Sequence, residues 1–472
     1  MFAPRRAARS RASLVVLCLG SVLGSWDARP CHAYPPFTIE VADNGGFGVD
    51  VGAYTSIKVD ASGNPHISYY DRDNGNLKYA SKSGGIWSSE PADNSSSDVG
   101  LYTSLALDAS GNPHISYQDV THGQLWYAHK SGGTWFKERV DPSADIVGAG
   151  TSIALSGAGE PRISYYDETL GDLKYARKSG STWTVETAAS AGNVGEYNSL
   201  QLDSQGNPHI SYYDRTNGDL RYAVKSGGIW TSEIADVSDD DTGRYSSLAL
   251  DWLGRPHISF FDATNHRLEY ATKSNGTWST TVIDDSDPDI GHDTGIALDA
   301  GGNPRISYYD AYYGDLTYAR KVNGTWEILY VDIDLNDVGQ YSSLAIDASG
   351  RPHMSYYDNL ANLLYAVGPA EVVGVAELGP DGPRRLTIAP NPSRGGPVRI
   401  AFAGARSAGV TTVEILDVGG RRLRTLELDG SGAVMWDGRD DNGRPAHAGI
   451  HFVFPVGAGG RTGRAQRLVV VH

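Results

Sequence analysis

The most informative segment of the chain reads Ile67-Ser68-Tyr69-Tyr70-Asp71. Close variants recur along the chain so that their final aspartates lie 47 or 48 residues apart. The seven aspartates are Asp71, Asp119, Asp167, Asp214, Asp262, Asp310 and Asp358. A tyrosine and a tryptophan keep the same step, beginning with Tyr79 and Trp87. Self-similarity with a period of about 40 to 50 residues is typical of repeat architectures.

Each repeat contains four short alternating stretches separated by turn residues. In the second copy the expected strands are Tyr102–Asp108, His114–Asp119, Leu125–Lys130 and Trp135–Val140. Glycine-rich turns such as Ser131-Gly132-Gly133 connect them. Four antiparallel strands per repeat predict a β-propeller, and the seven copies predict seven blades. A helical solenoid would need apolar stripes at the helical period, which the repeats lack.

The seventh copy is incomplete, because no tryptophan strand follows its third strand, Leu363–Val367. A spare strand, Phe37–Val41, precedes the first copy instead. We expect this N-terminal strand to complete the seventh blade as its outermost strand. Closing the ring in this way removes the two unpaired ends of an open array.

Residues 1–33 have the features of a secretory signal peptide. Arginines between Arg5 and Arg11 precede the apolar run Ala12–Gly24, and Cys31-His32-Ala33 offers small residues for cleavage. The apolar run is too short to span a bilayer, and no later segment predicts a transmembrane helix. Both cysteines lie in this leader, so we expect a secreted or cell-surface protein without disulfides.

Composition supports a turn-rich all-β protein, with 57 glycines and 27 tyrosines but only 3 methionines. The formal net charge of −16 argues against a nucleic-acid partner. The last part of the chain differs, because residues 381–472 contain 13 arginines, no lysine and 8 acidic residues. This asymmetry predicts separate domains. We expect a propeller over residues 34–368, a linker over 369–383 and a second domain over 384–472.

The second domain is expected to be a small β-sandwich. Its alternating stretches are Val398–Phe402, Thr412–Leu416, Leu423–Leu428, Ile450–Val456 and Leu468–Val471.

Four motifs carry a family resemblance: Pro390-Asn391-Pro392, Leu416-Asp417-Val418-Gly419-Gly420-Arg421, the run from Trp436 to Gly443, and Ala448-Gly449-Ile450. They resemble the Ig-like module of flagellar hook-capping proteins and the related sorting domains of type IX-secreted surface proteins. The resemblance implies a surface or extracellular destination and says nothing about a ligand.

The repeated polar residues are interpreted as scaffold, since one active site needs only one copy. Asp71 and its equivalents can accept turn N–H groups, and Asp60 opens an Asp-x-x-Gly turn that recurs in most blades. His66 and its equivalents begin the second strand, too far apart from blade to blade to share a metal. The turn at Ser131–Trp135 distantly resembles the Asp-box of sialidase-like propellers but lacks the aspartate. No catalytic residues are identified.

A ring of tyrosines opens the innermost strands: Tyr54, Tyr102, Tyr197, Tyr245 and Tyr341, with Gly150 and Asp293 at the same position in the third and sixth copies. In propellers this end of the strands shares a face with the turns between second and third strands. Aromatic rings beside carboxylates suit sugars. The five tyrosines and Asp293 are therefore the candidate ligand-binding residues, although packing between blades also explains the tyrosines.

Acidic runs between blades are candidates for Ca²⁺, because oxygen-rich loops can hold this ion. The candidate ligands are Asp285, Asp287, Asp289, Asp332 and Asp334. Solvated charge explains the same runs, and no other cofactor is expected.

The sequence predicts a monomeric, non-catalytic binding protein for carbohydrate or another cell-surface polymer. Propellers also host enzymes. A glycan-active hydrolase or lyase with two blade-specific carboxylates is the first alternative, and a protein–protein scaffold is the second.

Overall fold

The computed structural model describes residues 37–322, 324–333, 336–370, 386–389, 397–402, 410–417, 421–429, 433–457, 460–461 and 466–470. Every regular element in these residues is a β-strand, which confirms the all-β fold class. Across these ranges there is no helix that could cross a lipid bilayer. The chain divides into two compact units, Met1–Val373 and Gly374–His472.

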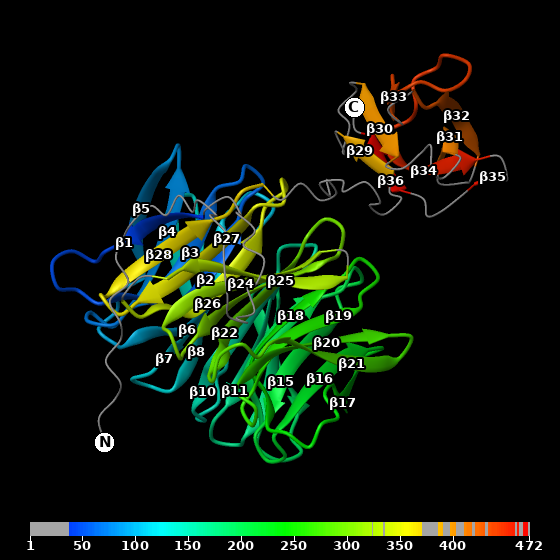
Figure 1. The fold of residues 1–472 in the computed structure, drawn as a ribbon. Helices are drawn as coiled ribbons and strands as arrows, with labels where there is room; N and C mark the ends of the chain where they lie inside the picture. Colours follow the sequence, from blue (N-terminus) through cyan, green and yellow to red (C-terminus); the bar gives the residue numbers. More distant parts are fainter. Residues whose placement is uncertain are drawn as a thin grey trace, which may run out of the picture. The chain divides into compact units, whose positions relative to one another are not determined.

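The first unit contains seven four-stranded antiparallel sheets, numbered here as blades 1 to 7 from the N-terminus (Figure 1). Blade 1 comprises β2 (Val51–Val59), β3 (Pro65–Asp71), β4 (Asn76–Ser83) and β5 (Ile86–Asp93). Blade 2 comprises β6 (Val99–Leu107), β7 (Pro113–Asp119), β8 (Gln124–Ser131) and β9 (Thr134–Arg139). Blade 3 comprises β10 (Val147–Leu155), β11 (Pro161–Asp167), β12 (Asp172–Ser179) and β13 (Thr182–Ala189).

The remaining blades repeat the same order from the innermost to the outermost strand. Blade 4 comprises β14 (Val194–Leu202), β15 (Pro208–Asp214), β16 (Asp219–Ser226) and β17 (Ile229–Ile234). Blade 5 comprises β18 (Thr242–Leu250), β19 (Pro256–Asp262), β20 (Arg267–Ser274) and β21 (Thr277–Asp284). Blade 6 comprises β22 (Ile290–Leu298), β23 (Pro304–Asp310), β24 (Asp315–Val322) and β25 (Thr325–Asp332). Blade 7 takes β26 (Val338–Ile346), β27 (Pro352–Asp358), β28 (Asn362–Val367) and, from the N-terminus, β1 (Thr38–Asp43).

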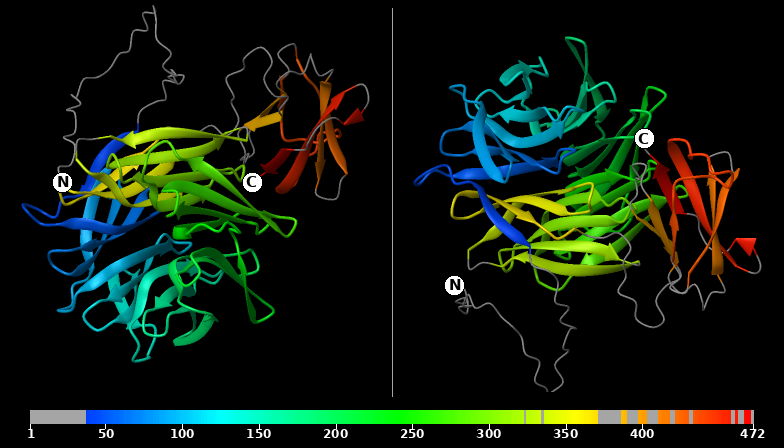
Figure 2. Two further views of the ribbon diagram at one scale, coloured as in Figure 1. Left: turned by 60° about the horizontal axis from the view of Figure 1, so that its bottom comes forward. Right: turned by 90° about the horizontal axis from the view of Figure 1, so that it is seen from above.

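The N-terminal strand closes the ring as expected. β1 pairs antiparallel with β28 in a register that places Thr38 opposite Val367. In Figures 1 and 2 the dark blue first strand lies beside the yellow strands of blade 7. Lys78 and Lys82 of blade 1 form ion pairs with Asp43 and Glu40 of β1, so the same strand also binds the first blade.

The cores lie between neighbouring blades. Leu77 and Tyr79 of blade 1 pack with Leu105 and Ile115 of blade 2, and corresponding clusters recur around the ring. Near the propeller axis the blades are joined by polar contacts. Ser56 accepts a hydrogen bond from the backbone N–H of Leu105 in the next blade at 3.0 Å. These contacts confirm that the repeated residues build the scaffold.

The turns between first and second strands use the aspartates identified from the sequence. Asp108 Oδ1 accepts the N–H groups of Ser110 and Asn112, each at 2.8 Å. A histidine at the start of the second strand then joins this turn to the third strand. In blade 7, His353 lies 2.7 Å from the Tyr365 hydroxyl and 3.2 Å from an Asp347 oxygen. This histidine position therefore has a structural role in the blade.

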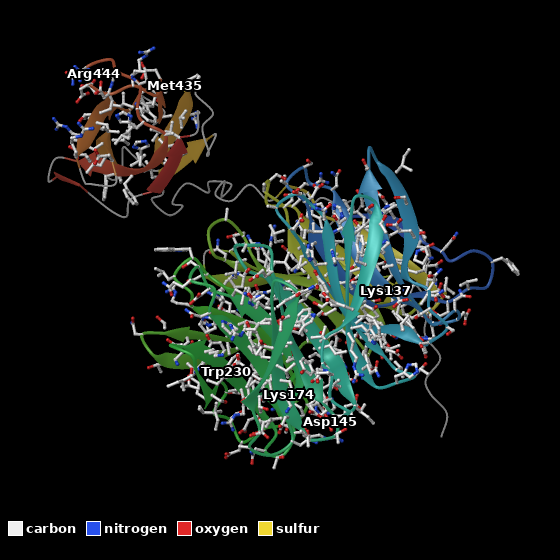
Figure 3. The ribbon with its side chains drawn as sticks, turned by 180° about the vertical axis from the view of Figure 1, so that it is seen from behind. Lys137, Asp145, Lys174, Trp230, Met435 and Arg444 are labelled. Carbon is white, nitrogen blue, oxygen red and sulfur yellow. The ribbon has the colours of Figure 1, made fainter. Side chains whose placement is uncertain are left out.

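The tryptophans of the outermost strands pack against the preceding blade. Trp230, labelled in Figure 3, packs edge-on against Tyr175 with ring centroids 5.3 Å apart. Its Nε1 donates to Glu186 at 3.2 Å, and Lys225 pairs with the same carboxylate. The equivalent arrangement in blade 2 joins Trp135 to Glu90 at 3.1 Å.

The second unit is a β-sandwich, as expected. One sheet has the order β29 (Leu386–Ala389), β30 (Val398–Phe402), β33 (Ala433–Trp436). The other has the order β32 (Arg422–Glu427), β31 (Val410–Asp417), β34 (Gly449–Gly457), β35 (Gly460–Arg461), and β36 (Gln466–Val470) also pairs with β34.

Both sheets of the sandwich contribute to one core. Trp436 and Ile400 of the first sheet pack with Ile415 and Val453 of the second. The Trp436 indole donates to the carbonyl oxygen of Arg439 at 2.8 Å, which satisfies its one buried donor. The five strands expected from the sequence are present among the described residues, and β29, β33 and β35 are additional.

Candidate functional site

One face of the propeller gathers the connections between blades and the turns between second and third strands. The N–H of Arg72, in the turn of blade 1, donates to the carbonyl oxygen of Asp50 in the connection at 2.9 Å. Val120 donates to Asp98 in the same way at 2.9 Å. This confirms the shared face expected from the sequence. We call it the tyrosine face, defined by seven ring positions: Tyr54, Tyr102, Gly150, Tyr197, Tyr245, Asp293 and Tyr341.

All seven ring positions have the left-handed backbone conformation, with φ between 47° at Asp293 and 56° at Gly150. Each lies where the register of the innermost strand shifts against its partner, as between Arg244 and Ser247 in blade 5. For a residue other than glycine this conformation costs on the order of 1 kcal/mol. This left-handed residue bends the innermost strand. The bend has a structural role, because the Tyr245 carbonyl oxygen accepts a hydrogen bond from the Thr294 hydroxyl of the next blade at 3.0 Å.

The bend explains the backbone at these positions but not the side chains. Gly150 adopts the same conformation without a side chain, and glycine is the least strained residue for it. Five blades nevertheless carry tyrosine there. We infer that the tyrosine rings have a role beyond maintaining the left-handed backbone conformation at these positions.

The rings form two contiguous arcs. Across blades 7, 1 and 2, the Tyr54 ring lies 4.5 Å from the Tyr341 ring and 4.8 Å from the Tyr102 ring. Across blades 4 and 5, the Tyr197 and Tyr245 rings lie 4.8 Å apart. The arcs are interrupted by Gly150 in blade 3 and by Asp293 in blade 6.

Each of these tyrosines is half-buried, so part of each side chain remains open to solvent. An aromatic residue of the second strand contacts four of the five rings, as Tyr213 contacts Tyr197 with ring centroids 6.2 Å apart, while blade 2 has Gln118 at that position. Burial, followed by nearby tyrosines and carboxylates, raises the pKa of Tyr102, Tyr245 and Tyr341 above the usual 10.0. Their hydroxyls are therefore neutral at physiological pH and can both donate and accept hydrogen bonds.

Most acidic residues of this face are held by partners within the chain. Asp98 accepts from the Tyr70 hydroxyl at 2.7 Å. Asp241 accepts from the Tyr213 hydroxyl at 2.8 Å and from Arg244 at 2.6 Å. These carboxylates tie the connections to the second strands, which is a structural role.

Asp293 differs from them. Its Oδ2 accepts the backbone N–H of Tyr341 at 2.7 Å. Burial raises the pKa of Asp293, and the Tyr341 hydrogen bond and the nearby His292 offset this only in part. The Asp293 charge in turn raises the pKa of four tyrosine hydroxyls around it: Tyr197, Tyr245, Tyr309 and Tyr341. One carboxylate therefore lies among phenol groups from blades 4 to 7.

Two histidines that occur in single blades meet at Asp289, which sequence spacing did not reveal. His292 Nε2 lies 2.8 Å from Asp289 Oδ1, and His266 Nδ1 lies 3.2 Å from the same oxygen. The His292 ring contacts the rings of Phe261 at 4.2 Å and Tyr245 at 5.2 Å. Burial opposes ionisation of Asp289, but these histidines hold its pKa below the usual value.

The candidate Ca²⁺ ligands do not converge in the described residues, where no group of three or more His, Cys, Asp or Glu side chains is arranged to hold a metal ion. Asp332 is buried and accepts the Tyr356 hydroxyl at 2.8 Å. Asp287 accepts from Ser286 at 3.2 Å, and Asp285 is exposed. Asp334 lies outside the described residues, so calcium binding by its run stays a prediction.

Comparisons with known proteins bear mainly on the second unit. Residues 389–456 match the FlgD Ig-like domain family, which confirms the resemblance seen in the sequence. No curated protein matches the chain.

Among solved structures, a protein of unknown function from Dyadobacter fermentans is 11% identical over 70% of this chain and 97% of its own, with a TM-score of 0.44. The fucose-specific lectin from Aleuria aurantia is 15% identical over 60% of this chain and 98% of its own, with a TM-score of 0.42. A leech intramolecular trans-sialidase is 11% identical over 68% of this chain and 67% of its own, with a TM-score of 0.38.

Proposed function

We propose that this chain is a non-catalytic binding protein that recognises carbohydrate, or another cell-surface polymer, through the tyrosine face. The observation that carries the proposal is the retention of five tyrosines at strained positions where Gly150 shows that no side chain is needed. Half-buried rings offer flat surfaces for the CH faces of sugars. Neutral phenol hydroxyls and nearby carboxylates offer hydrogen bonds to sugar hydroxyls.

The proposal is tested by binding of the purified chain to a broad array of glycans and polysaccharides, with and without calcium. We expect specific hits that weaken when Tyr102 or Tyr245 is replaced by alanine. A calcium requirement for these hits would assign the metal that the acidic runs predict. If the array shows no binding in either condition, the carbohydrate proposal is wrong and a protein partner becomes the leading ligand.

A second candidate function is a glycan-active hydrolase or lyase, and one observation favours it. Asp289 and Asp293 occur together in blade 6, and their surroundings shift their pKa values in opposite directions. Pairs of carboxylates with separated pKa values suit an acid and a base. Release of new reducing ends or unsaturated products from the bound glycan, abolished by Asp289→Asn, would establish the enzyme.

We further propose that residues 1–33 direct export, that the propeller spans 34–368, and that the Ig-like unit over 384–472 acts as a sorting domain for display at the cell surface. Its similarity to the FlgD Ig-like domain supports the module but not the sorting role. Expression in a bacterium with type IX secretion tests this role. Surface display should be lost when residues 384–472 are removed, and unchanged display of the shortened chain would contradict the proposal.

A further inference from the structure

The sixth blade departs from the repeat twice on the same innermost strand. Asp293 replaces the tyrosine of the ring, and two residues later Gly295 replaces a serine that the other six blades retain. That serine accepts the N–H of the next blade, as Ser247 does from Ile296 at 3.2 Å. A Cβ atom at Gly295 would lie 3.1 Å from the backbone nitrogen of Leu344. The backbone at Gly295 is therefore closely packed against blade 7, and strand β22 departs from the repeat through a carboxylate at the ring and a glycine two residues later.

Among the described residues Asp293 has no cationic partner, whereas two other acids of this face do. Asp50 pairs with Arg72 at 2.9 Å, and Glu196 pairs with Arg215 at 3.0 Å. Within the described residues no lysine or arginine forms an ion pair with Asp293, and the hydrogen bond that its carboxylate accepts is from the backbone N–H of Tyr341 at 2.7 Å. A ligand is thus the natural source of a compensating positive charge.

The surroundings of Asp293 suit an organic ammonium group better than a metal ion or a sugar hydroxyl. Tyr245 of blade 5 and Tyr341 of blade 7 occupy the ring positions on either side of Asp293. The Asp293 carboxylate contributes to the raised pKa of both hydroxyls. An ammonium group gains a charge-assisted hydrogen bond from the carboxylate and a cation–π attraction from the rings. A hard metal ion would require several oxygen ligands, and a neutral hydroxyl would leave the charge uncompensated.

We propose that the tyrosine face selects glycans that carry a free amino group, with the ammonium at Asp293 and the sugar ring against Tyr245 or Tyr341. This inference rests on the proposed function, because it names the class of glycan that the same face takes. It also assigns Asp293 the role of a specificity-determining residue rather than a member of the scaffold.

The experiment compares two oligosaccharides of equal length, one of glucosamine with free amines and one of N-acetylglucosamine. Calorimetric titration of the full chain should show binding of the amine form on the order of tenfold tighter than the acetylated form. Asp293→Asn should remove this preference, so that the two oligosaccharides bind the variant with equal affinity. Asp293→Tyr, which restores the residue of five other blades, should do the same and guards against misfolding of the first variant.

Asp98→Asn is the matched control, since Asp98 is an acid of the same face that already binds Tyr70. It should leave the preference intact. Equal affinities of the wild-type chain for the two oligosaccharides, or a preference that survives both Asp293 variants, would overturn the inference while the proposed function stands. Failure of both sugars, together with an empty glycan array, would overturn the proposed function and the inference together.

Discussion

The two ends of the innermost strands are built from the same seven repeats but differ in how strictly the repeats agree. At one end lie the turns between first and second strands, where Asp108 and its equivalents bind the turn backbone in blade after blade. At the other end lies the tyrosine face, where the backbone bend is equally regular but the side chain changes at Gly150 and Asp293. The difference shows that side chains bound to their own turn backbone vary little around the ring, with Ser156 in blade 3 as the exception that still accepts a turn N–H. A residue whose side chain does not bind the turn backbone can differ in a single blade and take a specific role there.

The largest effect should come from a change that opens the ring on which both ends depend. A chain that begins at Gly45 lacks β1, so β28 becomes an unpaired edge and Lys78 and Lys82 lose their carboxylate partners. We expect the melting temperature of the propeller to fall by about 10 °C or more. Calorimetry against a chain that begins at Phe37 checks this. Equal melting temperatures would show that closure by β1 contributes nothing.

The next largest effect should separate the two ends. Asp108→Ala leaves the N–H groups of Ser110 and Asn112 without their acceptor. The free energy of unfolding should fall by about 1 to 2 kcal/mol while glycan binding stays unchanged. Urea denaturation measures the free energy of unfolding, and titration with a glycan identified on the array measures the affinity. A loss of binding without a loss of stability would contradict the scaffold role.

At the tyrosine ring we expect the reverse, a loss of glycan binding with little change in stability. Tyr245→Gly removes a ring but relieves the left-handed backbone at φ 54°, so stability should change by no more than about 1 kcal/mol. Glycan affinity should nevertheless fall about tenfold. Tyr312→Ala, at an exposed tyrosine in a turn of the same face, is the control and should affect neither. A large loss of stability in Tyr245→Gly would instead assign the ring to packing.

The smallest effect concerns pH and the scaffold histidines. Burial, with a contribution from His129, lowers the pKa of His114 from 6.5 to about 4. In the unfolded chain His114 is protonated below pH 6.5, whereas in the folded chain it stays neutral until about pH 4. The free energy of unfolding therefore decreases as the pH falls from 6.5 to 4. His114→Gln should reduce the loss between pH 7.5 and 5.5 by about 1 kcal/mol. Denaturation curves at both pH values measure it, and an identical pH dependence in the variant would contradict it.

Much of the fold could be read from local patterns. The strands, the turns and the seven blades follow from alternation and from residues such as Asp108 and Gly111, whose partners lie within four positions. The closing role of β1 followed from counting strands. The candidate ring residues were also identified from the sequence, because they occupy one position of the repeat. Their left-handed backbone was not, although glycine at position 150 was a signal for it.

The sequence by itself therefore determined the period, the strand order, the scaffold residues and the places where the repeat is broken. Only the tertiary structure decided what those breaks bring together. The Tyr341 N–H reaches Asp293 from 48 residues away, and His266 and His292 meet on Asp289 from different blades. These contacts cross between blades, so they depend on the angle and distance at which closed blades face one another. Local patterns carry no information about that geometry.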